Sequence, residues 1–204
     1  MAGKLESVRK KKWPWILAIC LLLIAAAALC YFYRGDSGVP TLIVETPQKL
    51  SVSQTEEITL DVTVSDLGDE RYPAMSMSIA FDSSRLEFLG VEEGNIFILS
   101  DENSSGQQLP DWSCNVNNSN DTGMINIMYL DMTGGKNAFT GELLAEDYNV
   151  VLRLKFRLRG SVRPGDVLDL ILEDAVFAAS DETQSLAMTT DTLKVKNGRL
   201  VIGE

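Results

Sequence analysis

The sequence predicts an all-β sandwich domain preceded by one N-terminal transmembrane helix. From residue 41 onward, short runs alternate between apolar and polar side chains, which is the two-residue period of a half-buried strand. Clusters of Gly, Pro, Asn and Asp separate these runs, as tight turns between antiparallel strands require. The chain has no long amphipathic helical pattern, and its one continuous apolar run lies near the N-terminus.

The apolar run at residues 13–33 is long enough to cross a membrane as a helix. Its 21 residues would span about 31 Å at about 1.5 Å per residue, against a hydrocarbon core of about 30 Å. The basic cluster Arg9–Lys12 precedes the run, and only Arg34 follows it closely. Because Lys and Arg stay on the cytoplasmic side, residues 1–12 are expected in the cytoplasm and the C-terminal part outside the cell. We therefore expect a single-pass protein of the cell membrane.

A cleaved secretory signal is the alternative interpretation of the same run. Small residues at Ala25–Ala28 could provide a cleavage site after an apolar core of suitable length. The apolar stretch continues to Tyr33, however, which favours an uncleaved signal anchor. Residues 34–40 then form a short polar linker, and residues 41–204 form the extracellular domain. Both interpretations export this domain.

The charge of the exported part argues against nucleic acid as a partner. The whole chain has a net charge of −11. Six of its 18 Lys and Arg, but only Glu6 of its 29 acidic residues, precede residue 35, which leaves 12 basic and 28 acidic residues and a net charge of −16. Binding to phosphates needs clusters of Lys and Arg, which this part of the chain lacks.

The residue types that most often carry out catalysis are scarce. The chain has no His, which excludes Ser-His-Asp and Cys-His catalysis and His-ligated zinc. Cys20 and Cys30 lie in the apolar run, so Cys114 is alone in the domain and no disulfide framework is expected. Adjacent acids such as Glu92 and Glu93 would point to opposite faces of a strand, unlike the paired carboxylates of a glycosidase. We expect no catalytic residue, no cofactor and no metal site.

The alternating runs predict the strands in order. They cover residues 41–45, 58–64, 75–81, 86–91, 124–132, 150–159, 167–173, 175–178 and 193–202. Asn197-Gly198, inside the last run, predicts a tight hairpin because this dipeptide suits turns with positive φ angles. Residues 101–123 are expected to form a long polar loop, and residues 143–148 one helical turn.

Three segments together resemble the bacterial cohesin domain. These are FDSSRLEFLGVEEG at 81–94, NNSNDTGMINIMYLD at 117–131 and DYNVVLRLKFRL at 147–158, followed by NGRLVI at 197–202. Their order and spacing extend the resemblance over about residues 41–202. It implies a nine-stranded jelly-roll sandwich of a superfamily that also contains carbohydrate-binding modules. The implied role is to bind dockerins, which are calcium-loaded helical modules of secreted polysaccharide-degrading enzymes.

One strand carries an unusual row of apolar side chains on its predicted outer face. In the run at 124–130, the residues expected in the core are Ile125, Ile127 and Tyr129. The alternate residues then face outward, and they are Met124, Asn126, Met128 and Leu130. A contiguous exposed apolar row is typical of a contact surface, and Met suits an adaptable one. We therefore predict that these four residues bind a protein partner.

The strand expected to face this row contributes small side chains. Its outward positions are Ala74, Ser76, Ser78 and Ala80. We include Ser76 and Ser78 among the candidate partner-binding residues. Cohesins often place Asn and Asp on this strand, so Ala74 and Ser76 predict either an unusual dockerin or another kind of partner.

Two alternatives to dockerin capture remain open at this point. Direct binding to a polysaccharide would need an exposed aromatic face, and Trp112 is the only tryptophan after the apolar run. Trp112 could equally cap the edge of the sandwich. The other alternative is an envelope interaction or assembly protein with a partner that is not a dockerin. All three hypotheses describe a non-catalytic binding module.

Overall fold

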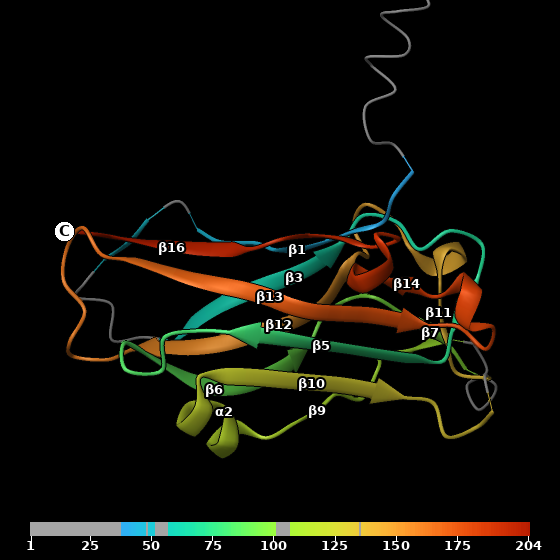
Figure 1. The fold of residues 1–204 in the computed structure, drawn as a ribbon, viewed down its shortest axis with the longest axis horizontal. Helices are drawn as coiled ribbons and strands as arrows, with labels where there is room; N and C mark the ends of the chain where they lie inside the picture. The colour runs from blue at the N-terminus through green and yellow to red at the C-terminus, as the bar shows by residue number, and fades with distance from the viewer. Residues whose placement is uncertain (1–37, 48, 52–56, 101–106, 135) are drawn as a thin grey trace, which may run out of the picture. The chain divides into compact units, whose positions relative to one another are not determined.

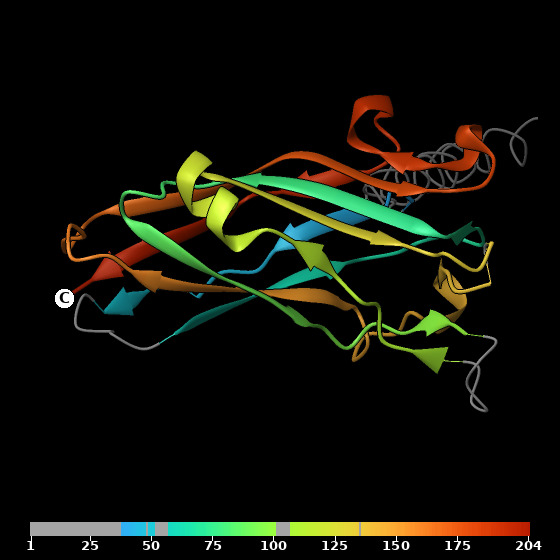
Figure 2. The same cartoon turned by 90° about the horizontal axis from the view of Figure 1, so that it is seen from below.

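Alternating strands pair into two sheets that pack face to face, as Figures 1 and 2 show from two sides. This computed structural model describes residues 38–47, 49–51, 57–100, 107–134 and 136–204. The predicted segment 1–12, the apolar run 13–33 and residues 34–37 of the linker lie outside the described residues. Within the described ranges, no helix has the length and apolar character needed to cross a membrane. Residues Val39–Glu204 form one compact unit.

The first sheet has five strands. Its order is β15 (Lys194–Lys196), β1 (Thr41–Val44), β3 (Ile58–Val64), β12 (Val150–Leu158) and β6 (Leu86–Glu93). β3 pairs with β1 and β12, and β12 pairs with β6, all antiparallel. Only β15 and β1 run parallel.

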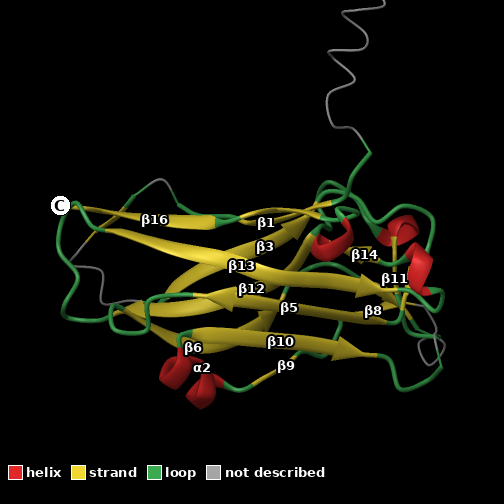
Figure 3. Cartoon of the chain, viewed as in Figure 1, coloured by secondary structure: helices red, strands yellow, loops and turns green. Residues whose placement is uncertain are grey.

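The second sheet has seven strands. Its order is β2 (Leu50–Ser51), β16 (Gly198–Gly203), β13 (Val167–Ala178), β5 (Ala74–Ala80), β10 (Met124–Leu130) and β9 (Ser113–Cys114), and β14 (Leu186–Ala187) also pairs with β13. Two small ribbons join β4 (Arg71–Tyr72) to β11 (Phe139–Thr140) and β7 (Ile98–Leu99) to β8 (Gln107–Gln108). The helical segments among the described residues are short (Figure 3), namely α2 (Val116–Thr122) beside β6 and β10, η1 (Gly141–Leu143), η2 (Glu182–Gln184) and η3 (Met188–Thr190).

This architecture confirms the predicted all-β sandwich. Nine of the described strands have three or more residues, as many as the alternating runs in the sequence. The inward residues of β3 and β5 are buried as expected. They are Ile58, Leu60, Val62, Val64, Met75, Met77 and Ile79. Phe81, Phe88 and Phe156 pack together in the core, with the ring centroids of Phe88 and Phe156 5.5 Å apart.

Two predicted strands are in fact one. The runs at 167–173 and 175–178 both belong to β13, whose register against β5 shifts between Leu172 and Asp174. One extra residue at this point is a β-bulge, and it moves the inward positions from even to odd numbers. Leu168, Leu170 and Leu172 are therefore buried before the bulge, whereas Ala175 and Phe177 are buried after it.

The predicted hairpin at Asn197-Gly198 is wrong. β15 ends at Lys196 and β16 begins at Gly198, but the two strands belong to different sheets, so the chain crosses from one layer to the other. Gly198 is required by a close approach rather than by a turn, because a Cβ atom there would lie 2.7 Å from Cγ1 of Val44. The Asn197 side chain accepts a hydrogen bond from the Leu172 backbone N–H at 3.0 Å, beside the bulge of β13.

Two loop predictions also need correction. The expected polar loop at 101–123 contains β8, β9 and α2 among its described residues, 107–123. Helix α2 starts at the cap Asn115 and ends at Gly123, which has a φ of 71°. The side chain of Asn120 exchanges two hydrogen bonds with the backbone of Phe88, which attaches α2 to β6. The helical turn expected at 143–148 is instead the 3₁₀ turn η1, which ends at Leu143.

Core packing predicts the effect of truncating Ile127. Ile127 is buried on β10, so replacing it with Ala should lower the free energy of unfolding by about 2–4 kcal/mol. The control is Met128→Ala on the exposed face of the same strand, which should change it by less than about 0.5 kcal/mol. Urea denaturation measures both, and equal losses would contradict the assigned faces of β10.

Two buried tyrosines predict alkaline unfolding. Burial, together with the charge of Asp131, raises the pKa of Tyr129 to about 12, and burial with Glu70 and Asp66 does the same to the pKa of Tyr72. Because both phenols ionise more readily in the unfolded chain, their contribution is complete below about pH 10 and is lost as the pH rises towards 12. Thermal melts between pH 9 and 12 should show this loss, and a flat profile would contradict it.

Candidate functional site

The outer face of β10 carries the predicted apolar row. Met128 is 51% exposed and Leu130 54% exposed. Asn126 is also exposed, and Met124 is half-buried. The intervening residues, Ile125, Ile127 and Tyr129, are buried in the core as predicted. Alternation along β10 therefore assigned every side chain of this strand to the correct face.

The structure also brings β5 beside β10, as the sequence predicted. The antiparallel register pairs Met124 with Ala80, Asn126 with Ser78, Met128 with Ser76 and Leu130 with Ala74. The six candidate partner-binding residues thus lie together on one face of the sheet. The hydroxyl of Ser78 donates a hydrogen bond to Oδ1 of Asn126 at 2.8 Å. A shallow hollow on this face extends to β9 and is lined by Ser76, Ser78, Asn126, Met128, Ser113 and Asn115, among others.

A third strand, β13, adds residues that the sequence analysis missed. On the other side of β5, the register pairs Ile171 with Ala80, Asp174 with Ser78, Val176 with Ser76 and Ala178 with Ala74. The sequence shows the change of phase at residues 173–174 and predicts a break between strands there, whereas the structure has one continuous strand. We call these twelve paired residues the outer patch: Met124, Asn126, Met128, Leu130, Ala74, Ser76, Ser78, Ala80, Ile171, Asp174, Val176 and Ala178.

The outer patch consists of four rows that run across three strands. Three of the rows contain apolar or small side chains. The remaining row is polar and consists of Asn126, Ser78 and Asp174. The short side chains of β5 lie between longer ones on β10 and β13, so the patch is lower along its middle strand.

The outer face of the five-stranded sheet has the opposite character. β12 presents three cations there, and each pairs with an acid on a neighbouring segment. Arg153 lies 3.1 Å from Asp61 on β3, and Arg157 lies 3.5 Å from Glu87 on β6. Lys155 binds both Glu57 and Glu92, and these hydrogen bonds raise its pKa. These three cations are paired within the domain, which suits a solvated surface.

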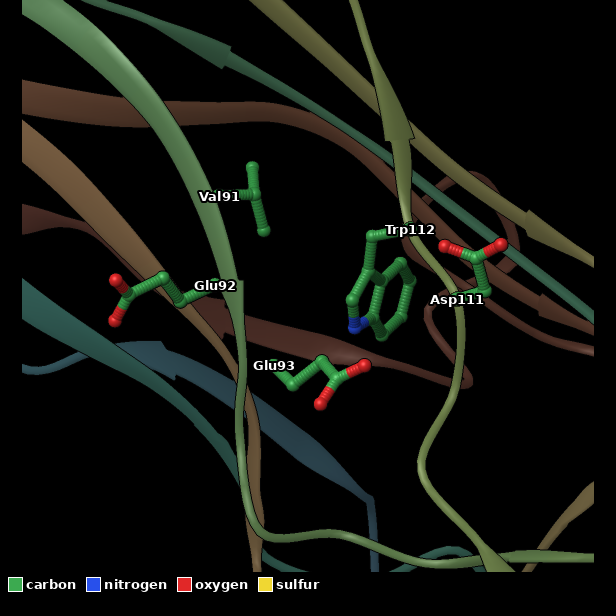
Figure 4. Close-up of a pocket in the computed structure, with 5 residues that line it drawn as sticks. All are labelled: Val91, Glu92, Glu93, Asp111 and Trp112. Carbon is green, nitrogen blue, oxygen red and sulfur yellow. The ribbon is translucent and has the colours of Figure 1, made fainter.

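Trp112 packs into the edge of the sandwich, and one face of its ring is covered. Its ring stacks on Phe139, with centroids 5.9 Å apart and planes at 29°. Tyr129 meets it edge-on at 6.1 Å. Figure 4 shows the indole opposite Val91, Glu92 and Glu93 of β6, in an open hollow that Asp111 also lines. The Trp112 ring is half-buried and its Nε1 atom is buried without a hydrogen-bond partner in the described part of the chain. This arrangement agrees with the capping role that the sequence left open.

The described residues contain no cluster of metal-binding side chains, and their one cysteine is disfavoured as a nucleophile. Among them, no three His, Cys, Asp or Glu side chains lie close enough to hold a metal ion. Cys114 on β9 is half-buried, and burial raises the pKa of its thiol, so the reactive thiolate is disfavoured.

Comparisons with known protein families and solved structures identify the family of this β-sandwich. A profile of the cohesin domain matches residues 44–196, which is more than half of the chain. The chain belongs to the cohesin domain family. Cohesin domains are non-catalytic binding modules, and the sandwich described above is the cohesin fold in this chain. No curated protein matches the sequence.

Solved cohesins share the fold at low sequence identity. The seventh ScaB type I cohesin from Pseudobacteroides cellulosolvens is 15% identical with a TM-score of 0.54, and the match covers 81% of this chain and 92% of that one. The sixth cohesin of scaffoldin B from Acetivibrio cellulolyticus, solved in complex with a Cel5 dockerin mutant, is 16% identical with a TM-score of 0.55, covering 80% and 99%. The OlpC cohesin from Clostridium thermocellum, also solved with a dockerin, has the same identity and TM-score, covering 81% and 94%.

The packing of Trp112 predicts a structural role for this residue. Trp112→Ala removes contacts with Phe139 and Tyr129, and should lower the free energy of unfolding by about 2–3 kcal/mol. The substitution should leave retention on cellulose, xylan and chitin columns the same as that of the unmodified chain, as measured by affinity chromatography. A folded Trp112→Ala variant that loses retention shown by the unmodified chain would instead favour direct glycan binding.

Proposed function

We propose that this cohesin captures a dockerin-bearing exported protein, such as a polysaccharide-degrading enzyme, through the outer patch. The observation that carries the proposal is the contiguous exposed apolar surface formed by Met128, Leu130 and their neighbours on three strands. Exposed apolar surface of this kind favours burial against a partner. Solved cohesins of the same fold, from Acetivibrio cellulolyticus and Clostridium thermocellum, form complexes with dockerins, and this supports the choice of partner.

The contrast between the two outer faces supports the choice of surface. On the five-stranded sheet, a partner would have to displace the pairs formed by Arg153, Lys155 and Arg157 before it gained any contact. On the outer patch, Met and Leu side chains gain free energy when they leave water, at about 25 cal/mol per Å² of apolar area. The outer patch is therefore the more favourable place for a protein interface.

The middle strand of the patch gives the interface its particular character. Ala74 and Ser76 occupy positions where cohesins often carry Asn and Asp, so β5 offers few hydrogen-bonding groups. Specificity from polar contacts is reduced there, and apolar burial by β10 supplies more of the affinity. The partner is then an atypical dockerin, or an envelope protein with a similar apolar surface.

The apolar run at residues 13–33 would hold the binding domain at the cell surface. With residues 1–12 in the cytoplasm and residues 13–33 in the membrane, the linker at 34–40 would hold the cohesin close to the outer surface. A binder without chemistry of its own would keep its partner, and the products of that partner, near the cell. The basic cluster before the run and its length support this location.

Affinity capture tests the proposed function. The chain is used as bait for the secreted fraction of its source organism, and Met128→Asp and Leu130→Asp variants are tested beside it. Each variant should lose capture, because a carboxylate buried without a partner against an apolar surface costs several kcal/mol. The matched control is Thr59→Asp, an exposed position on the outer face of the five-stranded sheet, which should capture normally.

The captured proteins then decide between the hypotheses. Dockerin-bearing hydrolases in the eluate support the proposal, and other envelope proteins favour the non-dockerin alternative. Circular dichroism shows that each variant is folded. Undiminished capture by folded Met128→Asp and Leu130→Asp variants would contradict the assignment of the outer patch.

A further inference from the structure

The crossover between β15 and β16 is a single asparagine that is followed by a glycine. Asn197 lies between Lys196, where β15 ends, and Gly198, where β16 begins. The asparagine is exposed, whereas the glycine is buried. No other Asn of the chain precedes a Gly. Such a pair is chemically labile, because the backbone nitrogen of a glycine can attack the preceding amide without hindrance from a side chain.

The reaction open to this pair is deamidation through a cyclic imide. The Gly198 nitrogen gives its proton to solvent and forms a bond to Cγ of Asn197. The bond between Cγ and Nδ2 then breaks, and Nδ2 takes a proton from solvent and leaves as ammonia. Water opens the ring at one of its two carbonyl carbons. One opening gives aspartate, and the other gives isoaspartate, in which the main chain passes through Cβ and Cγ and is one atom longer.

The hydrogen-bond ladder between β16 and β13 opposes this ring closure. Gly198 pairs with Leu170 in the antiparallel register. The Ile202 N–H donates to the carbonyl oxygen of Asp166, directly before β13, at 2.9 Å. Alternation along an antiparallel strand then turns the N–H of Gly198, four residues earlier, towards β13 as well. Ring closure would replace this hydrogen by Cγ of Asn197, so the first residue of β16 must leave β13 before the reaction.

Two further contacts hold the crossover closed. A Cβ atom at Gly198 would lie 2.7 Å from Cγ1 of Val44 and 3.0 Å from Cγ2 of Thr46, so this backbone is tightly enclosed. The Oδ1 atom of Asn197 accepts a hydrogen bond from the Leu172 N–H at 3.0 Å, which fixes the side chain against β13. The reactive amide and the attacking nitrogen are therefore both restrained by the packing of neighbouring strands.

We infer that Asn197 is a deamidation site that the closed crossover protects, and that its isoaspartate product prevents the crossover from closing again. This inference is independent of the proposed function. Local opening of a strand end needs less free energy than global unfolding, so the reaction proceeds from a locally open state. The longer main chain of isoaspartate cannot keep both the register of Gly198 with Leu170 and its packing against Val44. The Leu172 N–H then loses its acceptor beside the bulge of β13.

The two products differ in their effect on the fold. Aspartate leaves the main chain unchanged, and its carboxylate accepts the hydrogen bond from the Leu172 N–H in place of the amide oxygen. The crossover therefore closes normally over aspartate and stays open over isoaspartate. The variant Asn197→Asp reproduces the harmless product and serves as the matched control for the other.

Reaction rates in the native and unfolded states test the protection. The full chain is incubated in mildly alkaline buffer with and without urea, and peptide mapping by mass spectrometry follows the conversion of Asn197. Labelling by an isoaspartyl methyltransferase identifies isoaspartate. The native rate should be roughly 100-fold lower, as expected for an open state that forms about 1% of the ensemble. Equal rates in the two states, or no conversion in urea, would overturn the inference.

Variants at the contacts of Gly198 locate the opening. Val44→Ala should raise the native rate about 3- to 10-fold, because it removes methyl groups that enclose Gly198. Thr46→Ser, which removes only Cγ2, should act in the same direction and is the second variant if Val44→Ala does not fold. Ile127→Ala is the control, because it lowers the global stability at a position three strands from β16. A rise with Ile127→Ala as large as that with Val44→Ala would show that global unfolding, and not the crossover, controls the reaction.

Hydrogen exchange at Leu172 measures the consequence of the modification. Its amide should be protected in the unmodified chain and in Asn197→Asp. The isoaspartate form, separated by chromatography, should lose this protection and melt at a lower temperature than Asn197→Asp. Protection and melting equal to those of Asn197→Asp would show that the crossover closes over isoaspartate, and would overturn the second half of the inference.

Discussion

The register shift in β13 is the constraint on which the geometry of the outer patch depends. A strand exposes alternate side chains, so a shift of one residue exchanges its two faces. The shift between Leu172 and Asp174 keeps Leu172 and Phe177 in the core and turns Asp174 and Val176 outward. The Asn197 side chain accepts a hydrogen bond from the Leu172 N–H, so a backbone group at the shift has a partner supplied by the crossover between β15 and β16.

The two outer faces of the sandwich show how one fold can combine solubility with binding. On the five-stranded sheet, the cations of β12 are neutralised by acids of adjacent segments. A partner protein that covered these ion pairs would gain little binding free energy. On the seven-stranded sheet, Met128 and Leu130 remain exposed. Apolar area of this kind favours association.

Local sequence patterns predicted most of the fold, and they failed where the outcome depended on distant segments. The faces of β3, β5 and β10 followed from alternation, which is a property of each strand alone. Asn197-Gly198 has the chemistry of a hairpin turn, but Gly198 packs against Val44 where the chain crosses between sheets. Helix α2 was missed because its residues are polar, and much of its attachment comes from Asn120 and the backbone of Phe88.

The sequence by itself determined the fold class, the cohesin family resemblance, the lack of His-based chemistry, and the outward row from Met124 to Leu130. The family resemblance rests on the order and spacing of three segments, whereas the other features depend on composition and on a two-residue period, which local sterics impose on any strand. Only the tertiary structure decided that β13 lies beside β5, so that Asp174 meets Ser78, and that Phe139 covers one face of Trp112. Such contacts join residues far apart in the chain, and they are set by how the two sheets bury their apolar faces together.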